Sequence, residues 1–154
     1  MAYTYAGIDS HKNTHTIVFM DCFHEKIGEM TIENLPNKFD AFFKEAQKYK
    51  ITGTSFAFGF EDVSAFGRLF VKFLINKNQI VKHVDSSLVA SERNAKNILN
   101  KTDSVDAECA GRVLINRFDK LPIVKIDEKF CNSSAYILTK KHDVLAIFVV
   151  SEQI

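Results

Sequence analysis

The chain has 154 residues, enough for one domain with a buried core and a short additional segment. Its composition is that of a soluble globular protein, and a formal charge of +1 neither requires nor excludes a nucleic-acid partner. Cys22, Cys109 and Cys131 are widely spaced and odd in number, which argues against a disulfide framework or a zinc site and fits a reducing cytoplasm. The apolar run 144–150 is too short to span a bilayer, and no export signal is visible at the N-terminus.

The first 34 residues predict three consecutive strands, over residues 3–8, 14–20 and 27–32. Polar residues form the connections between them, and both connections are short. Short connections favour an antiparallel meander.

From Pro36 the apolar residues follow a helical period, and proline is favoured in the first turn of a helix. Residues 54–60 then predict a buried strand, 66–74 a second amphipathic helix and 80–84 a fifth strand. Because strands four and five are each reached through a helix, we expect them to add in parallel to the edge of the meander.

The polar, basic stretch 85–102 has no clear period, so helix, loop and mobile segment all remain open. A helix is predicted over 104–118, followed by an extended linker over 121–126 and a helical segment over 127–154. This order of elements is that of an α/β, ribonuclease H-like fold: a mixed sheet of three antiparallel and two parallel strands with flanking helices.

Acidic residues fall where this fold brings segment ends together. Asp9 ends the first strand and Glu61 ends the fourth, which is its expected neighbour. The last helix returns Asp103 and Asp106 to the same edge. Four carboxylates in one cleft repel unless a divalent cation neutralises them, and Mg²⁺ or Mn²⁺ prefers such oxygen ligands. The pattern therefore predicts a metal site for phosphodiester chemistry.

Asp103 and Asp106 lie three residues apart, on one face of the predicted helix. The apolar stripe that continues this face turns Asp106 toward the interior, where a carboxylate needs a partner. Simpler interpretations exist for each acid: Asp103 as a helix N-cap, Asp9 as a turn residue, and Glu61 as part of a helix opening.

Basic residues near these acids are candidate contacts for a nucleic-acid backbone, although a solvated charged face is the alternative for each of them. The candidates are Lys12, Arg93, Lys96 and Lys101, with Arg68, Lys72 and Lys82 between the first two in the chain. The five histidines show no metal-ligand spacing and are predicted to be surface or turn residues.

The motifs together resemble the DEDD transposases of bacterial insertion sequences, a group that includes the Piv-type DNA invertases. The resemblance is carried, in order, by Gly7-Ile8-Asp9 with Lys12, Phe58-Gly59-Phe60-Glu61-Asp62 with Gly67 and Leu69, Val84-Asp85, and Lys101-Thr102-Asp103 with Asp106-Ala107. It covers the N-terminal RuvC-like domain of that family, over residues 3 to about 126.

The resemblance implies that Asp9, Glu61, Asp103 and Asp106 bind Mg²⁺, that the substrate is DNA, and that a structured guide RNA directs target choice in transposing members. It also implies a C-terminal domain that contributes a nucleophilic serine. We expect residues 1–122 to form the RuvC-like domain and residues 123–154 a linker and the start of a helical connector, with recombination incomplete without the serine domain. The apolar stretch near the end predicts a homo-oligomer formed through residues 130–154.

Three alternatives remain open. A stand-alone nuclease of the Holliday-junction resolvase type would use the same four carboxylates to cut phosphodiesters with water as the nucleophile. A fragment that binds nucleic acid without turnover is also compatible with the motifs. A sugar or acetate kinase is disfavoured because the turn Ser10-His11-Lys12-Asn13 is not a glycine-rich phosphate loop.

Overall fold

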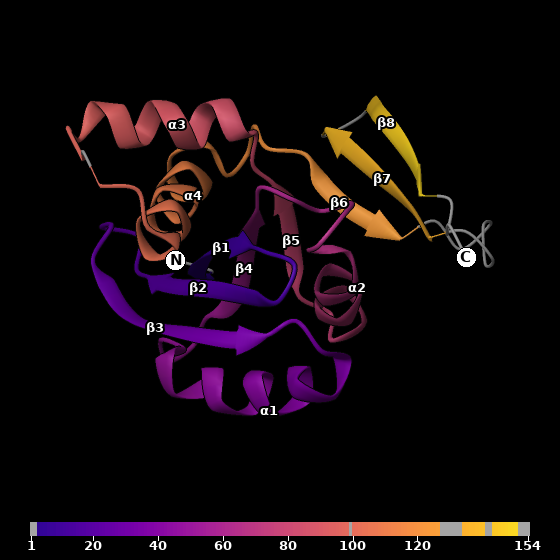
Figure 1. The fold of residues 1–154 in the computed structure, drawn as a ribbon, viewed down its shortest axis with the longest axis horizontal. Coiled ribbons are helices and arrows are strands. Elements are labelled where there is room, and N and C mark those ends of the chain that lie inside the picture. Colours follow the sequence, from indigo (N-terminus) through magenta and orange to yellow (C-terminus); the bar gives the residue numbers. More distant parts are fainter. Residues whose placement is uncertain (1–2, 99, 127–133, 141–142, 151–154) are drawn as a thin grey trace.

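The computed structural model describes residues 3–98, 100–126, 134–140 and 143–150 (Figure 1). Its elements follow in the order β1 (Tyr3–Ser10), β2 (Thr14–Met20), β3 (Lys26–Glu33), α1 (Pro36–Ala46), a 3-10 turn (Gln47–Tyr49), β4 (Ser55–Phe60), α2 (Arg68–Asn76), β5 (Ile80–His83), α3 (Ser86–Ala95), α4 (Asp103–Arg117), β6 (Ile123–Ile126), β7 (Ser134–Lys140) and β8 (Asp143–Val150). Among the described residues, no helix is long and apolar enough to cross a bilayer.

The strands form a single mixed sheet in the order β3-β2-β1-β4-β5-β6-β7-β8. β1, β2 and β3 are the predicted antiparallel meander, and β4 and β5 add in parallel beside β1. The α/β, ribonuclease H-like fold predicted from the element order is therefore confirmed. The sheet then continues through β6, β7 and β8, all antiparallel, a continuation that the predicted element order did not include.

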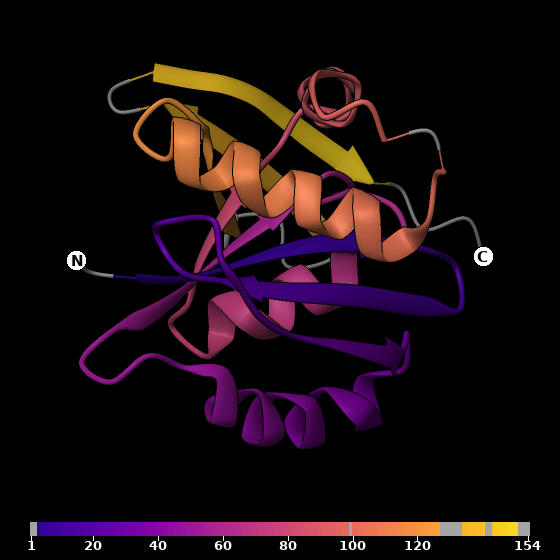
Figure 2. The same cartoon turned by 90° about the vertical axis from the view of Figure 1, so that its left-hand side faces the viewer.

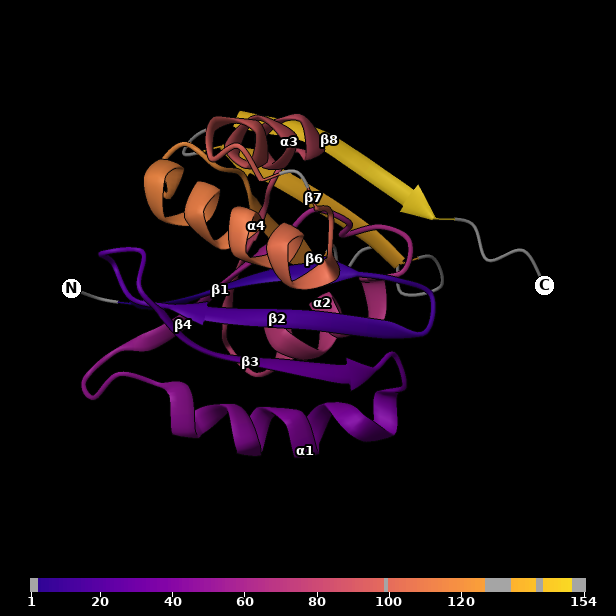
Figure 3. The same cartoon turned by 60° about the vertical axis from the view of Figure 1, so that its left-hand side comes forward.

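Helices cover both faces of the sheet, as Figures 2 and 3 show by placing α1 on one side and α4 on the other. α1 and α2 bury their apolar faces in an aromatic core, where the Phe39 and Phe70 rings lie at a centroid distance of 4.8 Å with their planes tilted by 36°. This core absorbs much of the unusually high phenylalanine content, because stacked and edge-on rings fill large volumes efficiently. α4 packs on the opposite face, and α3 lies outside it.

The stretch left open over residues 85–102 contains α3, a regular helix. Asp85 caps it by accepting a hydrogen bond from the backbone N–H of Ser87 at 2.8 Å. An aspartate at the N-cap satisfies a backbone donor that has no partner within the helix, which explains why a weakly periodic sequence begins a helix there.

The prediction of a helical segment over residues 127–154 is wrong where the structure describes that segment. Residues 134–140 and 143–150 are strands paired with each other, and Ile123–Ile126, predicted as a linker, pairs with both β5 and β7. These strands are rich in isoleucine, valine, tyrosine and phenylalanine, which favour a pleated sheet, and they lack a helical stripe. Residues 127–133, 141–142 and 151–154 lie outside the described part of the chain.

Candidate metal centre

The approach of α4 to β1 sets the position of the site. A Cβ atom added to Gly7 would lie 2.0 Å from the carbonyl oxygen of Ala107 and 2.2 Å from the backbone nitrogen of Gly111. Only a glycine in β1 allows this backbone contact. The start of α4 is therefore brought over the end of β1, two residues before Asp9.

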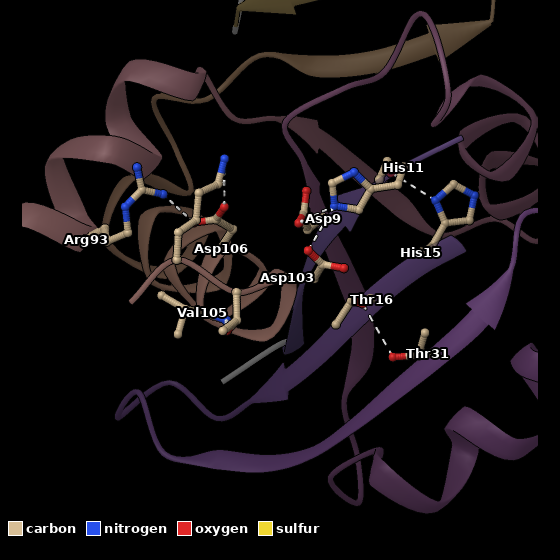
Figure 4. Close-up of polar contacts among 12 residues, drawn as sticks. Asp9, His11, His15, Thr16, Thr31, Arg93, Asp103, Val105 and Asp106 are labelled. Atoms are coloured by element: carbon tan, nitrogen blue, oxygen red, sulfur yellow. Dashed lines mark hydrogen bonds and ion pairs between the residues drawn. The ribbon is translucent and has the colours of Figure 1, made fainter. Parts of the chain in front are cut away.

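Asp9 and Asp103 meet around the side chain of His11, which follows β1 in the turn to β2 (Figure 4). His11 Nε2 lies 3.1 Å from a carboxylate oxygen of Asp9 and 3.1 Å from one of Asp103. Burial lowers the pKa of His11, but the negative charges of Asp9 and Asp103 more than offset this, so the pKa is raised. The three residues have ligand atoms that all lie within 4.8 Å of one another, the reach of a single metal ion.

Thr102, not Asp103, caps α4. Its hydroxyl oxygen accepts a hydrogen bond from the backbone N–H of Val105 at 3.2 Å, and Asp103 is the first helical residue. The alternative interpretation of Asp103 as an N-cap is thus wrong, and its carboxylate is available to the site. Ser104 holds the same turn to β3, because its hydroxyl donates to Glu29 at 2.6 Å.

Asp106 points inward, as its place on the apolar stripe predicts, and the whole residue is 6% exposed. Its partners are cations: the Arg93 guanidinium of α3 donates to one carboxylate oxygen, and Lys101 Nζ lies 3.6 Å from the other. Figure 4 shows Arg93 and His11 on opposite sides of the acidic group. Protein cations therefore already compensate part of the negative charge.

Glu61 follows β4 directly, at the edge where β1 also ends. Burial raises the pKa of Glu61, and the negative charges of Asp9 and Asp106 raise it further. Burial likewise raises the pKa of Asp9; His11 opposes that rise, while Asp103 and Asp106 add to it. Asp103 and Asp106 thus lie close enough to Asp9 to raise its pKa, and Asp9 and Asp106 lie close enough to Glu61 to raise its pKa.

The ligand atoms within reach of one cation come from Asp9, His11 and Asp103. Two of these residues offer carboxylate oxygens, which Mg²⁺ and Mn²⁺ prefer over nitrogen or sulfur. Glu61 and Asp106 are not part of this group of three, although Asp106 acts electrostatically on Asp9, and Asp9 on Glu61. The raised pKa values of Asp9 and Glu61 reflect partly desolvated carboxyl groups that a bound cation would stabilise in the charged form.

The predicted nucleic-acid-binding residues lie around this edge in two different states. Lys12 is exposed in the β1–β2 turn. Arg93 and Lys101 contact Asp106, and Lys96 Nζ lies 3.3 Å from Glu108. Their role in nucleic-acid binding stays a prediction.

The prediction of surface or turn positions is confirmed for His11, which is exposed in the β1–β2 turn, and is wrong for His15. His11 is also a member of the acidic group, a role that its position two residues after Asp9 could have indicated. His15 is fully buried: its Nδ1 lies 3.0 Å from the Ser10 hydroxyl and its ring stacks on Phe70 at 4.9 Å. Neither role follows from ligand spacing, because that of His11 depends on the packing of α4 on β1 and that of His15 on the position of β2 against α2.

An acidic edge built from β1, β4 and α4 on a ribonuclease H-like sheet is the arrangement of a metal-dependent enzyme class that acts on polynucleotides. A family model described as a transposase, the DEDD type of IS110 elements, matches residues 6–132. The chain therefore belongs to the IS110-type DEDD transposase family. A search of curated proteins found no match to this chain.

Proposed function

We propose that the chain binds Mg²⁺ or Mn²⁺ through Asp9, Glu61, Asp103 and Asp106 and uses this site in the cleavage and transfer of DNA strands. Family membership supports the transposase-type nuclease function. The observation that carries the metal proposal is geometric: the ligand atoms of Asp9, His11 and Asp103 all lie within 4.8 Å of one another. The raised pKa values of Asp9 and Glu61, caused by burial and by other acids of the same set, agree with it.

The chain's own residues have separate tasks on this proposal. The four carboxylates hold the cation, which would neutralise their charge and polarise a phosphate oxygen of the DNA. Arg93 and Lys101 now neutralise Asp106. Once a cation takes over that task, their side chains become available to contact phosphate groups of the DNA backbone.

Metal titration tests the proposal directly. Calorimetry with Mn²⁺ is expected to give a saturable heat for the native chain, with affinity reduced at least about tenfold in Asp9→Asn and Asp106→Asn, since each variant removes a charged ligand. Asp119→Asn is the matched control, because Asp119 is an exposed acid just beyond the other end of α4. Equal weak heats for all four proteins contradict the shared-cation proposal.

A non-catalytic function has one observation in its favour, which is that Asp106 already has two cationic partners. A site neutralised by the protein itself does not need a metal in order to fold. Absence of Mn²⁺ binding together with retained DNA binding would support this second candidate. Mg²⁺-dependent cutting of branched DNA by the purified chain would instead favour a resolvase-type nuclease.

We further propose DNA, together with a structured guide RNA, as partners, a cytoplasmic location, and self-association through the C-terminal region. β8 is the last strand of the sheet, and an edge strand carries unpaired backbone groups that a second copy of the chain can pair with. Light scattering checks this, and a monomer at all concentrations tested contradicts it.

A further inference from the structure

The loop between β4 and α2 is held in one shape by its own side chains. Both carboxylate oxygens of Asp62 accept hydrogen bonds from the loop backbone, from the N–H groups of Ser64 at 3.1 Å, Ala65 at 2.8 Å and Phe66 at 2.8 Å. Gly67 follows in close contact, since a Cβ there would lie 1.9 Å from the Asp62 carbonyl oxygen. The backbone of Phe66 is therefore fixed from the side of Asp62.

The other side of Phe66 is tied to the acidic edge. Its carbonyl oxygen accepts a hydrogen bond from Asn34 Nδ2 at 2.9 Å. The same amide nitrogen lies 3.3 Å from the carbonyl oxygens of both His11 and Lys12. Asn34 thus joins the Phe66 loop to the turn that carries His11, whose side chain contacts Asp9 and Asp103.

Despite this fixed backbone, the Phe66 side chain is 49% exposed. Phe60 and Phe70 on either side of it in the sequence are fully buried. Leu69, in the first turn of α2, and Leu35, next to Asn34, are also exposed, at 45% and 47%. The loop thus presents an aromatic residue to solvent, and Asn34 connects its backbone to the turn that carries His11.

Exposed lysines lie on these same segments, together with the exposed acid Glu33. Lys12 in the β1–β2 turn, Lys38 in the first turn of α1 and Lys72 in α2 are exposed. The loop itself contains two acids: Glu61 belongs to the proposed metal site, and Asp62 has both carboxylate oxygens engaged by backbone N–H groups. Exposed apolar surface with cations around it is complementary to a nucleic-acid strand, which combines base faces with phosphates.

We propose that Phe66 is a stacking platform for an unpaired base of the DNA strand whose phosphate lies at the acidic edge. This rests on the proposed function, and it adds a specific contact to it. A single ring on a rigid loop suits a base, because stacking needs one flat surface and little ordering on binding. A protein partner is less favoured, since the apolar patch is small and lysines lie on the same segments.

The test uses anisotropy of a fluorescein-labelled single-stranded oligonucleotide, with Ca²⁺ present to limit cleavage. Phe66→Ala is expected to weaken binding about tenfold, the effect of losing one stacked base, while Phe66→Trp retains affinity. Phe23→Ala is the matched control. Phe23 is 78% exposed, and its backbone N–H donates a hydrogen bond to the Asp21 side chain at 2.8 Å, as that of Phe66 does to Asp62. It follows β2, at the opposite end of the strands from Phe66.

A second oligonucleotide with abasic sites separates stacking from phosphate binding. The native chain and Phe66→Ala should bind the abasic strand equally, because no base remains to stack. A Phe66→Ala variant that binds the normal strand as well as the native chain does overturns the proposal, as does an equal loss on both strands. A change in oligomeric state with unchanged DNA affinity assigns Phe66 to a contact between protein chains and also overturns it.

The outcome is distinguishable from failure of the proposed function. If the native chain binds Mn²⁺ and DNA, and Phe66→Ala binds DNA with the same affinity, only the stacking platform is wrong. If the native chain binds neither Mn²⁺ nor DNA, both proposals are wrong.

Discussion

Gly7 in β1 and Gly111 in α4 are in backbone contact, so close that a Cβ atom on Gly7 would lie 2.2 Å from the Gly111 nitrogen. This contact sets how far α4 reaches over the sheet edge. The first turn of the helix, which carries Asp103 and Asp106, takes its place relative to Asp9 from that packing.

Gly7→Ala is expected to displace α4 and reduce both stability and metal affinity, because the new methyl group meets backbone atoms that cannot rotate away. We expect a loss of about 3 kcal/mol in the free energy of unfolding by urea, at the upper end for overpacking. Gly111→Ala should cost less, since its nearest contact is the flexible Met20 sulfur at 2.8 Å. The reverse order of the two losses contradicts this account.

Arg93→Met is expected to destabilise the metal-free chain and to strengthen Mn²⁺ binding. Asp106 is buried, and removing its guanidinium partner leaves Lys101 as the cation that the structure places on it, a loss of about 1–3 kcal/mol. Saturating Mn²⁺ should restore much of that loss, because the cation replaces the missing charge. Urea titrations with and without Mn²⁺ measure both effects.

Arg112→Met provides the comparison, since Arg112 contacts Glu108 on the same helix at 3.1 Å without touching the four acids. It should show no gain in metal-dependent stabilisation. Equal responses of the two variants to Mn²⁺ contradict a specific competition between Arg93 and the metal.

Thr102→Ala is expected to remove the N-cap of α4 and loosen the turn that carries Asp103 and Asp106. The loss of stability should be about 1 kcal/mol, as for other threonine caps, with a measurable fall in Mn²⁺ affinity by calorimetry. Asp85→Ala removes the cap of α3 at similar cost but lies outside the acidic group. A matching fall in metal affinity in Asp85→Ala argues against a local effect of Thr102.

The buried imidazole of His15 is expected to make the folded chain less stable in mild acid. Burial lowers its pKa below the ordinary value of 6.5, so the unfolded chain binds a proton that the folded chain does not. Stability should therefore fall as the pH drops below about 6.5, by up to about 1.4 kcal/mol per pH unit for this one residue.

His15→Gln is expected to flatten that slope in urea titrations between pH 7 and 5 (about the range of an ordinary histidine). His83, whose pKa burial also lowers, should leave a remaining slope that His83→Gln removes. An unchanged slope in His15→Gln shows that its titration does not contribute.

The sheet order from β1 to β5 was predictable because period-two and helical patterns alternate clearly up to residue 84, and short connections limit the topologies. The C-terminal strands were not, since a continuous apolar run has no period that separates a strand from a buried helix. The pairing of β6 with β5 and β7 decides between them through long-range hydrogen bonds.

The four acids were predictable as a group, because each lies at an end of a strand or helix that the fold brings to one edge. Their partners were not. His11 reaches Asp103 and Arg93 reaches Asp106 across 92 and 13 residues of chain, and only the packing of α4 on β1 and of α3 on α4 makes those contacts.

The sequence by itself determined where the four acids lie along the chain, because local order places Asp9, Glu61, Asp103 and Asp106 at the ends of elements. The tertiary structure alone decided how their charge is balanced and which surface lies beside them. Charge compensation and the exposure of Phe66 depend on distances between segments, and such distances are set by packing rather than by local sequence preference.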